Sequence, residues 1–128
     1  MPRNLKIAVS AGEPSGDSHA ARLVSEILSL DGNAAFFGMG GEHLKKAGVR
    51  IDVPMESVSV VGISEVMSRI GDIYRAYRRF CAVIEEEKPD ALVVVDFPDF
   101  NFKLLKFAKK TGIPVIYYIT PQVWAWRK

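Results

Sequence analysis

The sequence has little cysteine, little histidine and no long hydrophobic run. The single cysteine, Cys81, cannot form an internal disulfide, which favours a reducing compartment. His19 and His43 have no cysteine or carboxylate at ligand spacing, so we expect surface residues and no metal site. No segment approaches the ~18 apolar residues that span a bilayer, and the N-terminus lacks the apolar region of a signal peptide. These absences predict a cytoplasmic protein without a metal or another cofactor.

The charge balance is nearly even. Seventeen basic and fifteen acidic side chains give a net charge of +2, which does not indicate a nucleic-acid partner. The chain has 128 residues, 48% of them hydrophobic, and shows no repeat or biased segment. We expect one domain that spans residues 1–128.

Short β-rich runs alternate along the chain with amphipathic helical segments. We expect helices at 15–30, 42–48, 62–88 and 100–112, and strands at 5–11, 34–41, 49–54, 91–97 and 113–120. The run "ALVVVDF" is nearly continuous in apolar residues, as is typical of a strand buried on both faces of a parallel sheet. The pattern predicts an α/β fold: a Rossmann-like parallel sheet with helices on both faces.

In such a fold, ligands bind beyond the carboxyl ends of the strands. Three segments follow predicted strands there: "GEPSGD", "DFPDFN" and "PQVWAWRK". The first puts two glycines and a proline before a helix, where backbone N–H groups can hold an anion. It is not a P-loop, and Glu13 and Asp17 would repel a phosphate, so a hydroxyl-rich sugar is at least as good a ligand. The alternative is a plain turn in which Ser15 or Asp17 caps the helix.

Asp96 ends the apolar strand. A carboxylate beside apolar walls tends to have a raised pKa, which suits a general base for a hydroxyl group. Pro98 stiffens the turn, and Asp99 is expected to cap a helix that starts near Phe100. The alternative is that both acids are structural.

The segment 58–79 joins an apolar lead to a helix that carries several arginines. Such a helix can lie on an anionic membrane, and it can equally pack in the core with a solvated basic edge. The four lysines of the next helix, Lys103, Lys106, Lys109 and Lys110, fit a solvated face.

Four motifs occur together and in order: "AGEPSGD", "VVGISEV", "DFPDFN" and "PQVWAWR". Together they closely resemble the N-terminal half of the lipid-A-disaccharide synthase family, from Ile7 onward. The resemblance implies an inverting hexosyltransferase of the two-domain GT-B architecture. It implies transfer of 2,3-diacylglucosamine from its UDP donor to 2,3-diacylglucosamine 1-phosphate, which forms lipid A disaccharide 1-phosphate and UDP. It also implies a peripheral protein at the inner face of the bacterial cytoplasmic membrane, and chemistry without a metal.

The resemblance also implies roles for residues of this sequence. Asp96 matches an essential aspartate proposed as the base that deprotonates the acceptor hydroxyl. The first glycine-rich loop, with Glu13, Ser15, Gly16 and Asp17, faces the substrate cleft. Asn101 belongs to the same motif as Asp96, with no role assigned. The segment 58–79 matches the region that engages membrane and acyl chains, which favours the membrane interpretation.

One departure from the family pattern matters most. GT-B enzymes hold the donor nucleotide mainly in a C-terminal domain, which we expect to be absent from this chain, so that the chain alone is inactive. Two other interpretations stay open. The chain can be a stand-alone α/β module that binds a nucleotide or phosphosugar, or a partner-binding domain with Trp124 and Trp126 at its interface.

Overall fold

A computed structural model describes residues 5–55, 66–95 and 98–118. Five strands form one parallel sheet in the order β3-β2-β1-β4-β5. The strands are β1 (Lys6–Ala11), β2 (Ala35–Gly40), β3 (Arg50–Pro54), β4 (Ala91–Val95) and β5 (Val115–Tyr118), and the helices are α1 (Pro14–Leu30), α2 (Glu42–Lys46), α3 (Val66–Glu87) and α4 (Pro98–Thr111). The predicted Rossmann-like sheet is confirmed.

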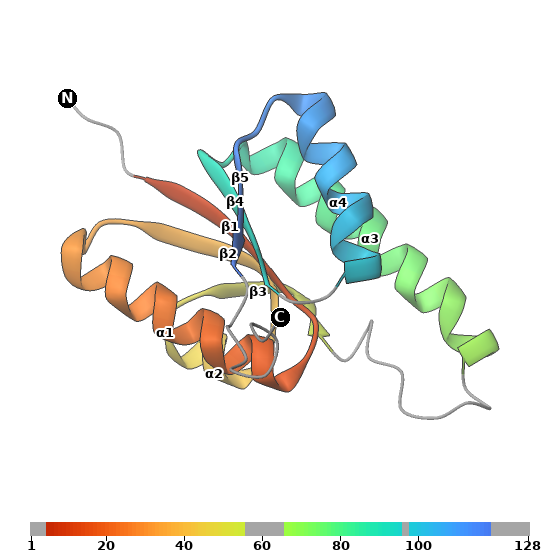
Figure 1. Ribbon diagram of the computed structural model, residues 1–128, viewed down its shortest axis with the longest axis horizontal. Helices are drawn as coiled ribbons and strands as arrows, with labels where there is room; N and C mark the ends of the chain where they lie inside the picture. Colours follow the sequence, from red (N-terminus) through yellow and green to blue (C-terminus); the bar gives the residue numbers. More distant parts are fainter. Residues whose placement is uncertain (1–4, 56–65, 96–97, 119–128) are drawn as a thin grey trace, which may run out of the picture.

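Helices cover both faces of the sheet: α1 and α2 lie on one side, and α3 and α4 lie on the other (Figure 1). Each side has its own apolar core. The core under α1 includes Ala20, Val24 and Val93, whereas the core under α3 and α4 includes Phe80 and Leu104. Alternate residues of β1 and β4 enter opposite cores, which explains why "LVVV" is buried throughout.

Glycine is required at position 38, in the middle of β2, where the strand lies against Val9 of β1 and the ring of Phe80. Its φ is +144°, and a Cβ there would overlap the carbonyl oxygen of Val9 and come within 3.1 Å of Phe80. The register of β2 against β3 shifts at this glycine. Any side chain at this position would therefore strain the backbone and push the central strands apart.

Two helices begin slightly earlier than the sequence predicts, each at a proline. Proline suits the first helical turn because its fixed φ fits the helix and its missing N–H is not needed there. The helix α1 begins at Pro14 after an extended Glu13, which caps it without a side-chain hydrogen bond. The helix α4 begins at Pro98, so Asp99 lies inside its first turn. The expectation that Asp99 caps a helix starting near Phe100 is therefore wrong.

Candidate functional site

The carboxyl ends of β1 and β4 meet at the switch point of the sheet, where the strand order reverses. From β1 the chain crosses to β2 on one side, and β4 pairs with β1 on the other. Ala11 pairs with Val95, so both strands end at the same level. This edge is where ligands bind in open parallel sheets.

The first glycine-rich loop packs directly on the end of β4. A Cβ at Gly16 would lie 3.5 Å from Val95 Cγ1, 3.8 Å from the Val95 carbonyl oxygen and 3.9 Å from Ala11 Cβ. These are ordinary van der Waals distances, so the first turn of α1 lies in direct contact with the ends of β1 and β4. Asp96 follows Val95 in the sequence, but its own placement lies outside the described residues.

The side chains of Glu13 and Ser15 are exposed beside this contact. Neither makes a hydrogen bond or an ion pair within the described part of the chain. A carboxylate and a hydroxyl at a helix start, without protein partners, can receive the hydroxyl groups of a sugar. Asn101 lies in α4, but its side chain is outside the described part.

Asp17 has a different environment from its neighbours, because it is only 1% exposed. Its carboxylate accepts hydrogen bonds from three backbone N–H groups: Gly41 at 2.7 Å, His43 at 2.9 Å and Leu44 at 3.2 Å. Asp17 therefore caps α2, not α1 as the capping interpretation expected, and it ties the first turn of α1 to the turn after β2.

This turn is built around the Asp17 carboxylate. A Cβ at Gly40 would lie 3.3 Å from Asp17 Oδ1, and a Cβ at Gly41 would lie 3.0 Å from Asp17 Oδ2 and 2.8 Å from Met55 Cε. The two glycines thus let the backbone N–H groups approach the buried acid. The turn is not among the segments that the sequence predicts at the site, although a Gly-Gly pair directly after a strand marks the same edge of the sheet.

The two histidines lie on the surface helices, as expected. His43 is exposed, and His19 is half-buried and lines a pocket together with Tyr118 of β5. Among the described residues, no three His, Cys, Asp or Glu side chains are grouped to hold a metal ion. No helix in the described ranges is long and apolar enough to cross a membrane.

The segment that favoured a membrane role is only partly described. In α3 the residues Ala76, Phe80 and Ile84 are buried in the core, whereas Tyr74 is 55% exposed. Arg78 donates to the Tyr74 hydroxyl at 3.1 Å and lies over its ring. Residues 56–65, which include the whole apolar lead from Val58 to Ile63, lie outside the described residues.

A groove between α3 and α4 is lined by Tyr77, Phe107 and three lysines, Lys106, Lys109 and Lys110. Burial, with a smaller contribution from its hydrogen bond with Cys81, raises the pKa of Tyr77 to about 12. The phenol is therefore neutral at physiological pH, and the groove carries the positive charge of its lysines.

Three solved structures share this fold. A glycotransferase of kitacinnamycin matches 93% of this chain and 31% of its own, at a TM-score of 0.66 and 20% identity. MurG from Acinetobacter baumannii matches 97% of this chain and 38% of its own, at a TM-score of 0.56 and 17% identity. A Siraitia grosvenorii transferase in complex with UDP matches 90% of this chain and 28% of its own, at a TM-score of 0.58 and 12% identity. These similarities show that the chain has a Rossmann-like fold that also occurs in these transferases.

Curated relatives match at much higher identity. Lipid-A-disaccharide synthase from Geobacter metallireducens is 47% identical over 124 residues, and that from Geobacter sulfurreducens is 48% identical over 122 residues. The alignments cover 97% and 95% of this chain and 32% of each relative, so the chain spans about a third of their length. The family model described as lipid-A-disaccharide synthetase matches residues 7–128. The chain therefore belongs to the lipid-A-disaccharide synthetase family.

Proposed function

We propose that this chain is the acceptor-side part of an inverting hexosyltransferase of lipid A biosynthesis. The reaction transfers 2,3-diacylglucosamine from its UDP donor to the 6-hydroxyl of 2,3-diacylglucosamine 1-phosphate, and it releases UDP. The observation that carries the proposal is the packing of Gly16 on Val95 at the switch point of the sheet. It is made in a chain that belongs to the lipid-A-disaccharide synthetase family. This packing brings the glycine-rich loop to the strand that precedes Asp96.

The proposed mechanism uses few groups. Asp96 acts as the general base that takes the proton of the acceptor hydroxyl while its oxygen attacks the anomeric carbon. Inversion needs one such in-line attack, with UDP leaving from the opposite face. Glu13 and Ser15 orient the acceptor, and Gly16 keeps the loop close to the base. Asp17 contributes through the turn that it holds, and Asn101 is a candidate contact in the same motif as Asp96.

The test is transfer by a full-length synthase that contains this sequence, with both acylated substrates. We expect disaccharide 1-phosphate and UDP in equal amounts, and no product without the phosphorylated acceptor. Release of UDP without disaccharide would contradict the proposal. The alternative, a stand-alone nucleotide-binding module, predicts instead that the 128-residue chain binds UDP tightly by itself.

We further propose that the protein acts at the inner face of the bacterial cytoplasmic membrane, bound peripherally through the α3 region. Exposed Tyr74, with Arg78 over its ring, and the lysine-lined groove beside α4 support this, because aromatic and basic side chains favour anionic interfaces. Sedimentation with anionic vesicles, compared with the Arg75/Arg78/Arg79→Ala variant, tests it. Equal sedimentation of both proteins would refute it. Arg79 also donates to the Asp52 carbonyl oxygen, so the variant's folding must be checked.

A further inference from the structure

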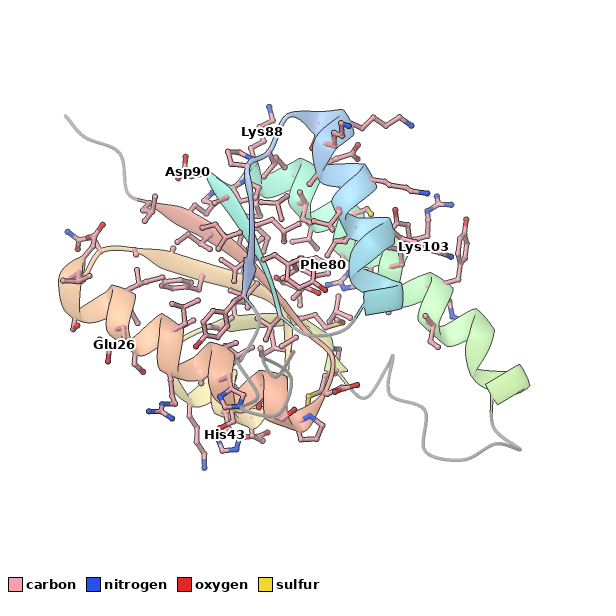
Figure 2. All side chains as sticks on the ribbon, in the orientation of Figure 1. Glu26, His43, Phe80, Lys88, Asp90 and Lys103 are labelled. Carbon is pink, nitrogen blue, oxygen red and sulfur yellow. The ribbon has the colours of Figure 1, made fainter. Side chains whose placement is uncertain are left out.

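A pocket of about 350 Å³ lies between α1 and the end of β5. Its lining residues are His19, Arg22, Leu23, Glu26 and Tyr118. The four residues of α1 lie on one helix face, because Arg22 and Leu23 come three and four residues after His19, and Glu26 comes four and three residues after them. Figure 2 shows the side chains of α1, with Glu26 labelled on this helix.

The pocket opens beside the candidate site. Tyr118 pairs with Val95, and Val95 pairs with Ala11, so the pocket reaches the same edge of the sheet as the glycine-rich loop. His19 comes three residues after Gly16, one turn further along α1. A ligand in this pocket therefore lies next to a ligand bound at the loop, on the α1 face.

Two side chains of the pocket that can donate hydrogen bonds, an imidazole and a guanidinium, have no hydrogen-bond or ion-pair partner among the described residues. His19 and Arg22 make no hydrogen bond or ion pair with another described residue. A guanidinium and an imidazole together are well suited to a phosphate, since both donate to its oxygens. This contrasts with Arg50, whose guanidinium is paired with Asp52 and Glu87.

The other three lining residues, Leu23, Glu26 and Tyr118, limit which kind of phosphorylated ligand fits the pocket. Leu23 and Tyr118 are half-buried against the core under α1, so they form a fixed apolar wall for a sugar ring. Glu26 is the one carboxylate among the described residues that line the pocket. It can accept from sugar hydroxyls, but it would repel the second charge of a diphosphate. The lining therefore fits a ligand with one phosphate and several hydroxyls better than it fits a nucleoside diphosphate.

We propose that this pocket is the subsite for the phosphorylated sugar of the acceptor, with Arg22 and His19 on the phosphate and Glu26 on a hydroxyl. The inference rests on the proposed function, because it assigns this pocket to that enzyme's acceptor. It makes Arg22 a specificity-determining residue that distinguishes a sugar 1-phosphate from an unphosphorylated sugar.

The test is an NMR titration of the 128-residue chain with glucosamine 1-phosphate, glucosamine and inorganic phosphate. We expect glucosamine 1-phosphate to shift the amide signals of His19–Glu26 and Tyr118, and the other two probes to bind at least about tenfold more weakly. Arg22→Gln should weaken binding of glucosamine 1-phosphate by about tenfold, because it removes a charge-assisted pair of hydrogen bonds. Lys46→Gln on α2, which removes an exposed positive charge outside the pocket, is the matched control and should bind as the parent does.

Three outcomes would overturn the inference. Equal binding of inorganic phosphate or of glucosamine would show that the pocket does not select a sugar phosphate. Equal weakening in Arg22→Gln and Lys46→Gln would show a general effect of charge, and no binding of any probe would show that the pocket is not a subsite. The Arg22→Gln variant of a full-length synthase separates this inference from the proposed function. If its transfer is normal and its KM for the phosphorylated acceptor is unchanged, the pocket is not the phosphate subsite, but the proposed transferase function stands.

Discussion

The two edges of the sheet treat their charged side chains in opposite ways. At the amino edge, Lys6 pairs with Glu87 at 3.0 Å and Arg50 pairs with Glu87 at 3.1 Å and with Asp52 at 2.9 Å. The Asp90 carboxylate accepts from the backbone N–H of Lys6 at 2.8 Å. The labels of Lys88 and Asp90 in Figure 2 mark this end of the molecule. The charges of these residues are satisfied within the protein, and their ion pairs join β1, β3 and α3.

At the carboxyl edge the buried acid is satisfied, whereas the exposed groups are not. Asp17 is enclosed by backbone N–H groups, while Glu13, Ser15, His19 and Arg22 have no partner within the described part of the chain. Polar groups that hold the fold are thus paired, and those at the candidate site are left for a ligand. The comparison teaches that pairing, not charge alone, separates the structural edge from the functional one.

Removing the buried acid of the carboxyl edge should have the largest effect on stability. Asp17→Ala leaves three backbone N–H groups, at Gly41 and in the first turn of α2, without this acceptor, and we expect a loss of about 3 kcal/mol in the free energy of unfolding. Urea unfolding measures it. Asp31→Ala is the matched control: Asp31 is an exposed acid that accepts one backbone N–H, from Asn33, and should cost under about 1 kcal/mol. Equal losses would show that burial of Asp17 does not matter.

Breaking the amino-edge network should cost less. Arg50→Gln removes two exposed ion pairs and the contact of the guanidinium with the Phe37 ring, so we expect a loss of about 1 kcal/mol or less. The loss should shrink in 1 M salt, because exposed pairs are screened. If Arg50→Gln lowered the free energy of unfolding by more than Asp17→Ala does, and by the same amount in 1 M salt, the predicted order of the two effects would be wrong.

The smallest expected effect is that of acid on the amino edge, where lowering the pH should remove the contribution of Glu87 to the free energy of unfolding. Hydrogen bonds from Lys6 and then Arg50 hold the pKa of Glu87 below its usual value. Because the folded-state pKa is the lower one, this contribution is complete above the unfolded pKa, near 4.5, and is lost as the pH falls through the folded value. Urea midpoints of the parent and of Glu87→Gln should therefore converge as the pH falls from 6 towards 3. A constant gap would contradict this.

The sequence predicts the order of elements and the sheet well, because apolar periodicity and terminal glycines or prolines are local signals. Gly48 and Gly112, for example, have positive φ values just after α2 and α4. The predicted starts of α1 and α4 are too late, because the prediction takes a serine or an aspartate as the cap. In the structure Pro14 and Pro98 are the first residues of these helices. The role of Asp17 could not be predicted, since its partners lie 24 to 27 residues away and meet it only in the folded chain.

The candidate site is predictable only in outline. The rule that ligands bind beyond carboxyl ends identified the first loop and Asp96. The pocket at Arg22 and Tyr118 was not found, because it depends on which strand lies beside α1 in space. Strand β5 supplies the Tyr118 wall of the pocket, and it begins 85 residues after the end of α1, at Val115 against Leu30.

Strand β4 offers the most direct test, because an aspartate flanks it at each edge. In a full-length synthase that contains this sequence, Asp96→Asn should lower kcat by about 10²-fold to 10⁴-fold with unchanged thermal stability, as expected for loss of a general base. Asp90→Asn should keep kcat within about twofold, since an asparagine oxygen can still accept from Lys6. Equal kcat values for the two variants, or full activity in Asp96→Asn, would contradict the assignment of function to the carboxyl edge.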